Sequence, residues 1–458
     1  MSSPRHVAVI DIGKTNAKLA LVDLDTLSEA AVRTAPNIVL SDGIYPHFDC
    51  DRIWTFILDG LAALNRQTPI DAISVTTHGC AAALIGDDGA LALPVLDYEY
   101  AGPEEMGRDY DDARPAFAET GTPRLPLGLN LGAQVFWQER TFPAEFAKVR
   151  TIVTYPQYWA YRLSGVLANE ATSLGCHSDL WDPHRRTFSS LVTRQGWEKR
   201  FAPVGRASER LGPILPDLAA RLGLRAGVAV HCGIHDSNAS LYPHLLQRAA
   251  PFSVVSTGTW VIVMSIGGRP DGLDAARDCL LNVNALSNPV PSARFMGGRE
   301  FSTLVQGVED CSDADLAHVL ENGIMLLPSV LQGSGPFPHR KHSWIGDEAS
   351  LTSGQRFAGV SLYLAMMSAT CLELTGAAGP VIVEGPFAKN RVFGAMLSVA
   401  TGRDVLASSG SATGTSIGAA LLAAEGTRPD ISFQVISALP QLVGDMACYA
   451  GKWRQATS

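Results

Sequence analysis

The chain has 458 residues, of which 46% are hydrophobic and 18% are charged, and its formal net charge is −9. A chain of this length exceeds one hydrophobic core and predicts two domains of roughly 200 residues each. The acidic balance, without any run of basic residues, argues against a nucleic-acid partner, because binding a phosphate backbone requires clustered Lys and Arg.

Eight cysteines are spread along the chain without a C-x-x-C pair or any close spacing. With no signal-peptide pattern at the N-terminus, they are interpreted as reduced, mostly buried thiols of a cytoplasmic protein. The longest apolar stretches are expected to fall short of the ~18 residues that span a bilayer, so no membrane partner is expected. The length is compatible with a symmetric homodimer.

The chain opens with an apolar run, a Gly/Thr/Asn turn and a second apolar run over residues 7–23. This pattern predicts a β-hairpin whose tip can hold a phosphate. Glycine lets the backbone approach an anion, and the side chains add hydroxyl, amide and ammonium donors. The donors of this turn are the backbone around Gly13 and the side chains of Thr15, Asn16 and Lys18.

Two other interpretations of this segment were weighed. Gly13-Lys14-Thr15 looks like the end of a P-loop, but that motif needs glycine where the chain has Ala8, and a helix where the pattern is β-like. The P-loop is therefore rejected. An ordinary edge hairpin with a polar tip stays an equal alternative on this segment alone.

Strand-like and helix-like segments alternate through the rest of the first half, as expected of an α/β domain. An insertion rich in Pro, Gly and charge, at 99–124, is expected to be irregular. The domain boundary is placed near 245–251, which gives domains of 1–247 and 248–458. The regular elements predicted between these points are a helix at 51–65, a strand at 72–77, a helix at 217–224 and a buried strand at 227–233.

The second half begins by repeating the opening design over residues 252–264, as apolar strand, Ser/Thr/Gly/Thr turn and apolar strand. Two such hairpins half a chain apart predict an internal duplication, with two like-folded domains that each direct a turn at a shared cleft. Two phosphate-facing turns suit a nucleoside triphosphate. The elements predicted after the hairpin are an irregular run at 327–338, helices at 355–373 and 391–401, a strand at 381–383 and a closely packing small-residue helix at 414–422.

Asp236 is the sharpest candidate for a chemical role, because an apolar strand delivers a glycine, this carboxylate and then a helix start. By position alone, Asp236 is a helix cap. Its place between the two hairpins favours a general base, since phosphoryl transfer to an alcohol needs one carboxylate to take the hydroxyl proton.

Three further positions are predicted to contact the substrate. His235 is expected to hydrogen-bond it beside Asp236; a zinc site with His231 is rejected because no third ligand is near. His78-Gly79 follows the strand at 72–77 and is either a neutral core histidine or a sugar-hydroxyl contact. Asp97 follows a short apolar run and is either solvated or a sugar ligand.

Five motifs in order resemble those of the FGGY carbohydrate kinases over essentially the whole chain. They are the first phosphate motif at Asp11–Asn16, the stretch Asn169–Ser173 before Leu180-Trp181-Asp182, the base motif at Gly233–Asp236, the second phosphate motif at Ser256–Trp260 and the adenosine motif at Gly385–Asn390.

The resemblance implies an α/β fold of two actin-like, ribonuclease H-like ATPase domains with a nucleotide and sugar cleft between them. It implies an ATP:sugar phosphotransferase in which Asp236 is the general base and Asp11 orients Mg²⁺ through water. The residues that it places around the nucleotide are Asp11, Gly13, Lys14, Thr15, Asn16, Lys18, Thr257, Gly258 and Thr259 at the phosphates, and Gly385 and Asn390 at adenosine.

The chain departs from the family pattern at Glu384-Gly385-Pro386, where many members have paired glycines. The Ser-Thr-Gly-Thr-Trp turn after a His-Asp base is most similar to the branch that acts on L-rhamnulose and L-fuculose. Another ketose or a polyol (xylulose, ribulose or erythrulose type) is the alternative substrate. A non-catalytic ATP-dependent sugar sensor or clamp is the alternative class, although the chain has neither a helix-turn-helix pattern nor a basic tail.

Overall fold

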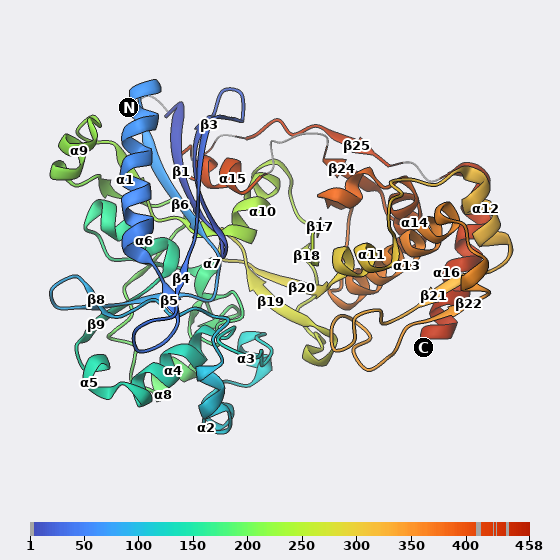
Figure 1. Ribbon diagram of the computed structural model, residues 1–458, viewed down its shortest axis with the longest axis horizontal. Helices are drawn as coiled ribbons and strands as arrows, with labels where there is room; N and C mark the ends of the chain where they lie inside the picture. Colours follow the sequence, from blue (N-terminus) through green and yellow to red (C-terminus); the bar gives the residue numbers. More distant parts are fainter. Residues whose placement is uncertain (1–3, 409–413, 425, 427, 437–438) are drawn as a thin grey trace. The chain divides into compact units, whose positions relative to one another are not determined.

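The computed structural model describes residues 4–408, 414–424, 426, 428–436 and 439–458 (Figure 1). The chain divides into two units between Gln247 and Arg248, where the sequence predicts the domain boundary. Residues 281–289 and 411–430 belong to unit 1 as well, and unit 2 holds the remainder. The predicted domains, 1–247 and 248–458, place these two segments with the second domain, whereas their contacts group them with unit 1.

Unit 1 is built on a seven-stranded sheet in the order β14-β15-β6-β1-β2-β3, with β16 also paired to β6. β1 runs antiparallel to β2 and parallel to β6, so the opening hairpin sits inside the sheet and not at its edge. The strands are β1 (His6–Ile12), β2 (Asn16–Asp23), β3 (Ser28–Pro36), β6 (Ala72–Thr77), β14 (Arg210–Pro213), β15 (Ala229–His231) and β16 (Ile234–His235).

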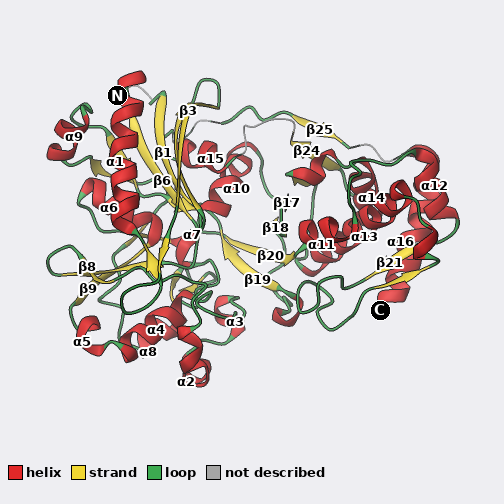
Figure 2. Cartoon of the chain, viewed as in Figure 1, coloured by secondary structure: helices red, strands yellow, loops and turns green. Residues whose placement is uncertain are grey.

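Alternate residues of β1 pack on opposite faces of this sheet, as the two-residue period of a strand requires. Ala8, Ile10 and Ile12 share a core with helices α1 (Cys50–Gln67) and α6 (Tyr155–Ser164). Val7 and Val9 pack on the other face with α10 (Asp236–Gln247) and α15 (Thr415–Leu421). Figure 2 shows these two helix pairs on either side of the strands.

Helix α15 confirms the prediction of a closely packing small-residue helix. A Cβ added at Gly418 would lie 1.7 Å from the carbonyl oxygen of Ala239 in α10, so only glycine allows the contact. Ser240 Oγ and Thr415 Oγ1, from the same two helices, are 3.0 Å apart. This contact explains why residues 411–430 belong to unit 1.

The rest of unit 1 forms a smaller sheet in the order β8-β7-β9 and a set of short elements. The predicted irregular insertion at 99–124 instead contains η1 (Gly102–Met106), α2 (Gly107–Ala113) and α3 (Phe117–Thr120). The remaining elements of unit 1 are β4 (Val39–Leu40), β5 (His47–Phe48), β7 (Ala82–Gly86), β8 (Leu91–Leu93), α4 (Leu131–Thr141), α5 (Pro143–Phe146), β9 (Val149–Thr154), β10 (Asn169–Glu170), α7 (Ala171–Leu174), β11 (Trp181–Asp182), β12 (Thr187–Phe188), α8 (Ser190–Arg194), β13 (Val204–Gly205) and α9 (Pro216–Leu222).

Unit 2 repeats the central pairing of unit 1, as predicted from the repeated hairpin. Strand β17 is antiparallel to β18 and parallel to β23, in a sheet of order β19-β20-β18-β17-β23-β24-β25. Its strands are β17 (Phe252–Thr257), β18 (Val261–Ile266), β19 (Cys279–Val283, which crosses the division between the units), β20 (Pro289–Phe295), β23 (Val381–Glu384), β24 (Val405–Ser408) and β25 (Phe433–Val435). Its other elements are η2 (Ala275–Arg277), α11 (Gly297–Leu304), α12 (Asp313–Glu321), β21 (Met325–Leu327), β22 (Ser343–Ile345), η3 (Glu348–Ser350), α13 (Ser353–Leu374), η4 (Pro386–Lys389), α14 (Arg391–Thr401), η5 (Pro440–Leu442) and α16 (Val443–Thr457).

Helix α13 corrects the expectation that every apolar stretch is too short to span a bilayer. Within the described residues it is the one helix long and apolar enough to do so, with a mean hydropathy of 1.5 over its best window. Of that window 83% is buried in the protein. A helix that is apolar on all sides is also what a protein core requires, and α13 lies in the main core of unit 2.

Candidate active site

The tip of the first hairpin is an ordered polar turn between β1 and β2. Gly13 N donates to Asn16 O at 2.9 Å, and Asn37 donates to Gly13 O from its side chain and to Thr15 O from its backbone. The side chains of Thr15 and Asn16 are exposed at this tip. Their side chains are 3.2 Å apart, from Asn16 Nδ2 to Thr15 Oγ1, and remain accessible to a ligand, whereas Gly13 N is used within the turn.

Asp11, at the end of β1, lies in a cluster of charged groups on unit 1. Its Oδ2 is 3.6 Å from Lys18 Nζ, which also contacts Glu29 Oε1 at 3.0 Å. Burial raises the pKa of Asp11 to about 6; the Lys18 ammonium opposes that rise and the carboxylate of Asp236 adds to it. Asp11 of β1 thus contacts Lys18 of β2, and the charge of Asp236 acts on its ionisation.

Lys14 does not share the open environment of its neighbours in the turn. Its ammonium forms an ion pair with Asp97 and lies 3.3 Å from Glu99 Oε2. The same nitrogen lies 4.9 Å from the ring centroid of Tyr98 and 5.1 Å from that of Phe48. In this arrangement Lys14 is held by the predicted sugar ligand Asp97, so Asp97 is a paired carboxylate and not merely a solvated one.

His78 is buried among aromatic rings, which supports the alternative that it is a neutral core histidine. The centroids of Phe48, Tyr155 and Tyr98 lie 5.0, 5.1 and 5.3 Å from its ring. Its Nδ1 is 2.7 Å from the carbonyl oxygen of Gly79. Burial lowers the pKa of His78 to about 4, so the ring is uncharged at neutral pH.

Asp236 stands at the junction that the sequence predicts, directly after β16 and as the first residue of α10. Its Oδ1 accepts a hydrogen bond from Ser237 N at 2.6 Å and lies 3.2 Å from His235 Nε2. Ser237 Oγ also donates to Oδ1 at 3.3 Å; all three of these contacts fall on Oδ1, and the side chain is 33% exposed. The second oxygen, Oδ2, can therefore receive a proton from a ligand.

His235 is fixed behind Asp236 by three contacts. Its backbone N donates to Thr172 Oγ1 at 3.1 Å, its Nδ1 is 3.4 Å from Asn238 Nδ2, and its Nε2 is 3.6 Å from Cys176 Sγ. Thr172 also donates to the buried Glu170, at 2.5 Å from Oγ1 and 2.9 Å from the backbone N. The family stretch at Asn169–Ser173 thus supports the strand that carries the base motif.

Sequence reasoning missed Cys80, Cys176 and His177, which lie beside this group. Cys80 Sγ is 3.4 Å from His177 Nδ1, and Cys176 contacts His235. A Cβ added at Gly79 would lie 3.1 Å from His235 Nε2 and 3.3 Å from Cys176 Sγ, so this predicted site glycine provides the room for both. The one indication of this group in the sequence is that Cys176 follows closely after the motif at 169–173.

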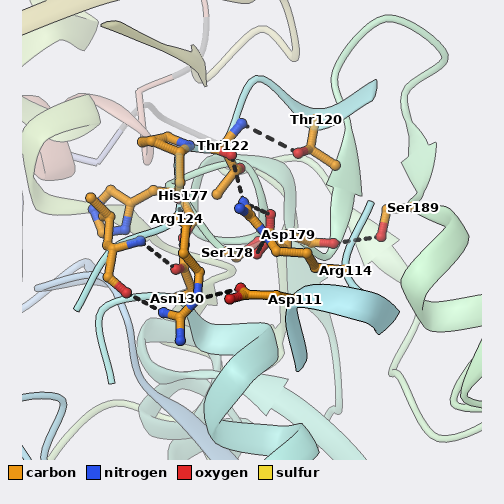
Figure 3. Close-up of polar contacts among 12 residues, drawn as sticks. Asp111, Arg114, Thr120, Thr122, Arg124, Asn130, His177, Ser178, Asp179 and Ser189 are labelled. Carbon is orange, nitrogen blue, oxygen red and sulfur yellow. Dashed lines mark hydrogen bonds and ion pairs between the residues drawn. The ribbon is translucent and has the colours of Figure 1, made fainter. Parts of the chain in front are cut away.

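The turn that carries Cys176 and His177 is held by a buried polar network (Figure 3). The fully buried carboxylate of Asp179 accepts hydrogen bonds from Arg114 at 2.9 and 3.1 Å and from the Tyr110 hydroxyl at 2.7 Å. Asn130 Nδ2 donates to His177 O at 2.9 Å. These contacts fix a turn in which His177 and Asp179 adopt φ angles of +38° and +64°.

The predicted residues of the second phosphate motif lie in unit 2, at the turn between β17 and β18. Gly258 and Thr259 are exposed. The Thr257 hydroxyl is buried: it donates to Glu384 O and accepts from Phe387 N at 3.1 Å. Thr257 therefore joins the hairpin to the adenosine motif, and its hydroxyl is engaged within the protein.

Gly385 and Asn390 both have local structural roles in unit 2. Gly385 has a φ of +80°, and a Cβ there would lie 1.9 Å from Thr257 O. Asn390 caps α14, with Oδ1 accepting from Phe393 N at 3.0 Å and Nδ2 donating to Ser361 Oγ at 2.8 Å. Both polar atoms of the Asn390 side chain are thus used by the protein, while Gly385 is exposed.

The donor set around Asp11 fits a magnesium ion that the substrate helps to bind. No group of three or more His, Cys, Asp or Glu side chains arranged for a metal occurs among the described residues. Mg²⁺ in phosphoryl-transfer sites is bound through one or two carboxylates, waters and substrate phosphates, and does not need a complete protein shell. The carboxylate of Asp11, at the end of β1 beside the exposed turn, meets that requirement.

The fold and the site together define a class of protein with two α/β units built on similar hairpins, the first bearing a carboxylate at a strand–helix junction. The model of the N-terminal domain of the FGGY family of carbohydrate kinases matches residues 6–242. The model of the FGGY carbohydrate kinase C-terminal domain matches residues 249–430. The chain belongs to the FGGY family of carbohydrate kinases, which confirms the predicted family.

Three similar proteins illustrate this assignment. L-fuculokinase from Salmonella typhi is 26% identical over 273 residues, 58% of this chain, and the match spans 57% of that relative's length. The solved structure of a carbohydrate kinase from Novosphingobium aromaticivorans is 38% identical, with a TM-score of 0.92 over 100% of this chain and 99% of that one. Gluconate kinase from Lactobacillus acidophilus is 14% identical and shares the fold, with a TM-score of 0.81 over 99% of this chain and 98% of that one. The predicted two-domain α/β fold is therefore confirmed.

Proposed function

We propose that this protein transfers the γ-phosphoryl group of ATP to a primary hydroxyl of a ketose. The observation that carries the proposal is Asp236, a partly exposed carboxylate whose contacts within the protein leave one oxygen for a substrate. Membership of the family supports the reaction class. Similarity to L-fuculokinase supports a 6-deoxyketohexose, such as L-fuculose or L-rhamnulose, as the substrate.

Asp236 acts as the general base in this mechanism. The sugar oxygen forms a bond to the γ-phosphorus as its proton passes to Asp236 Oδ2, and the bond from that phosphorus to the β–γ bridging oxygen breaks to release ADP. The transition state of phosphoryl transfer is loose, so the nucleophile needs little negative charge until late in the step. Orientation of the hydroxyl is therefore the main contribution of Asp236.

The first hairpin holds the phosphates in this proposal. Gly13 N is bonded to Asn16 O, so the donors are the other N–H groups of this turn and the side chains of Thr15 and Asn16. The Lys18 ammonium, which also contacts Asp11 and Glu29, adds positive charge beside them. Asp11 would hold Mg²⁺ through water, and the ion would neutralise charge on the phosphates. Lys14 stays with Asp97, where the pair would face the sugar and not the nucleotide.

A coupled assay of ADP release across a panel of ketoses, aldoses and polyols tests the substrate. ADP release that one 6-deoxyketohexose stimulates many-fold supports the proposed substrate. A preference for xylulose or a polyol would contradict that substrate and assign the protein to another branch of the family. A slow rate that no sugar changes would contradict kinase activity and favour an ATP-dependent sensor.

The base is tested by Asp236→Asn, which keeps the shape of the side chain but not its proton affinity. We expect kcat to fall by about 10² to 10⁴ while ATP binding, measured by calorimetry, is retained. Asp71→Asn is the matched control, because Asp71 is a carboxylate of unit 1 paired with Arg225 before the first residue of β6. Near-normal turnover by Asp236→Asn would show that Asp236 is not the general base.

A further inference from the structure

The two cysteines and two histidines beside Asp236 form a cluster that the proposed reaction does not use directly. We propose that Cys176 is a positioning residue for the catalytic base, and that it acts through His235 to hold the carboxylate of Asp236 in the orientation that accepts the substrate proton. This inference rests on the proposed function. Four features of the structure support it.

The first feature is a continuous chain of contacts that leads from the interior to the exposed carboxylate. Cys176 Sγ lies 3.6 Å from His235 Nε2, and the same nitrogen lies 3.2 Å from Asp236 Oδ1. Cys176 is 5% exposed and His235 is 7% exposed, whereas the Asp236 side chain is 33% exposed. His235 Nε2 thus contacts both the buried Cys176 sulfur and the carboxylate of the proposed base, Asp236.

The second feature is that the imidazole has little freedom to leave this position. Gly79 packs so closely that a Cβ would meet both His235 Nε2 and Cys176 Sγ within 3.3 Å. Asn238 contacts the opposite ring nitrogen at 3.4 Å, and Thr172 holds the backbone N. A change at Cys176 is therefore transmitted to Asp236 through a ring that is otherwise fixed.

The third feature is the strained backbone that brings Cys176 to this position. His177, Asp179 and Cys80 all have positive φ angles, of +38°, +64° and +59°. Such conformations cost free energy in residues other than glycine and persist where the surrounding structure enforces them, often at functional sites. The network of Arg114 and Asp179 (Figure 3) supplies that enforcement.

The fourth feature is the charge around His235. The titratable groups that face its ring are Cys176 and His177 from the turn after α7, Asp236 from α10, Glu170 from β10 and His78 after β6. Burial opposes a charged ring, but Cys176 and Asp236 outweigh it and raise the pKa of His235. Burial likewise opposes a thiolate at Cys176, but His177 and His235 outweigh it and lower the pKa of Cys176. Cys176 and Asp236 thus both act on the charge of the His235 ring, through the same nitrogen that they contact.

The test compares Cys176→Ser and Cys176→Ala with Cys371→Ala, a buried cysteine in unit 2. The titration of His235 is followed by NMR of histidine-labelled protein without substrate, and His235→Gln assigns its signal among the eleven histidines. We expect both Cys176 variants to move this titration to lower pH by at least about one unit, since the partner that favours the charged ring is gone. Cys371→Ala should leave it unchanged, and an unchanged titration in both Cys176 variants would overturn the inference.

Kinetics separate a positioning role from a merely structural one. We expect Cys176→Ser to lower kcat about tenfold, to shift the basic limb of the pH–kcat profile and to change the KM for ATP less than about twofold. In the His235→Gln background, Cys176→Ser should have little further effect, because the contact chain is already broken. Full additivity of the two substitutions would overturn the inference.

The two proposals fail in different ways. If no sugar is phosphorylated but the NMR titration still moves, the contact chain stands and the proposed reaction fails. If a ketose is phosphorylated but the titration and the pH profile stay unchanged, the positioning role of Cys176 fails and the reaction stands.

Discussion

The two hairpins have the same strand pairing but different turns. In unit 1 the turn at 13–16 has exposed Thr and Asn side chains, and Asp11 and Lys18 stand beside it. In unit 2 the Thr257 hydroxyl points into the protein, and the backbone is packed so closely that a Cβ at Gly298 would lie 1.9 Å from Gly258 O. Similar turn sequences thus serve two purposes: charge and open donors in unit 1, and a tightly fixed backbone in unit 2.

The comparison predicts that Gly385, which packs against the end of β17 in unit 2, is required more strictly than Gly13 in the turn of unit 1. Gly385→Ala places a Cβ 1.9 Å from Thr257 O at a φ of +80°, so we expect it to lower the free energy of unfolding by about 3 kcal/mol or more. Gly13→Ala meets its nearest atom, Asn16 O, at 3.3 Å, and should cost less than about 1 kcal/mol. Denaturant unfolding of both variants measures the difference. Equal losses would show that the close contact of Gly385 with Thr257 O does not limit this position to glycine.

The regular elements could be predicted because their patterns are local. The strand predicted at 72–77 and the helix predicted at 391–401 have the bounds found in the structure. The membership of residues 281–289 and 411–430 in unit 1 was not predictable in this way, because it depends on contacts such as that of Gly418 with Ala239, far apart in the sequence.

The site shows the same division between local and distant information. Asp236 could be predicted because a strand end, a glycine and a helix start adjoin it in the sequence. The partner of Lys14 is Asp97, 83 residues away, and Cys80 meets His177 across 97 residues. The sequence next to these residues does not indicate such contacts, so only the structure reveals them.

The base motif of unit 1 has a buried carboxyl group, Glu170, behind it. Burial raises the pKa of Glu170 to about 7, against hydrogen bonds from Thr172 that lower it. Because the folded pKa lies above the unfolded value of 4.5, the native protein binds the proton more tightly, and stability falls as pH rises from about 4.5 to about 7. We expect Glu170→Gln to remove this loss, on the order of 1–3 kcal/mol.

The measurement is the unfolding free energy of the wild type and of Glu170→Gln between pH 4 and pH 8. The variant should gain stability relative to the wild type as pH rises through this window, and the difference should level off above about pH 7. Thr257→Val, which alters the neutral turn of unit 2, should show no such pH dependence. A difference between Glu170→Gln and wild type that is constant with pH would contradict a buried, titrating Glu170.

The smallest expected effects come from two threonines of the hairpins, Thr257 at the end of β17 and Thr15 in the turn after β1. Thr257→Val removes a buried hydroxyl together with its hydrogen bonds to Glu384 O and from Phe387 N, so we expect a loss of about 1–2 kcal/mol in unfolding free energy. Thr15→Val changes an exposed side chain and should stay within about 0.5 kcal/mol.

Their kinetic effects should follow the opposite order, since only the exposed hydroxyl can donate to a phosphate without breaking a contact within the protein. Thr15→Val should raise the KM for ATP, whereas Thr257→Val should act through stability and leave the KM near that of the wild type at temperatures well below unfolding. A larger rise in KM for Thr257→Val would mean that its hydroxyl leaves Glu384 to bind nucleotide, and the two turns would then work in the same way.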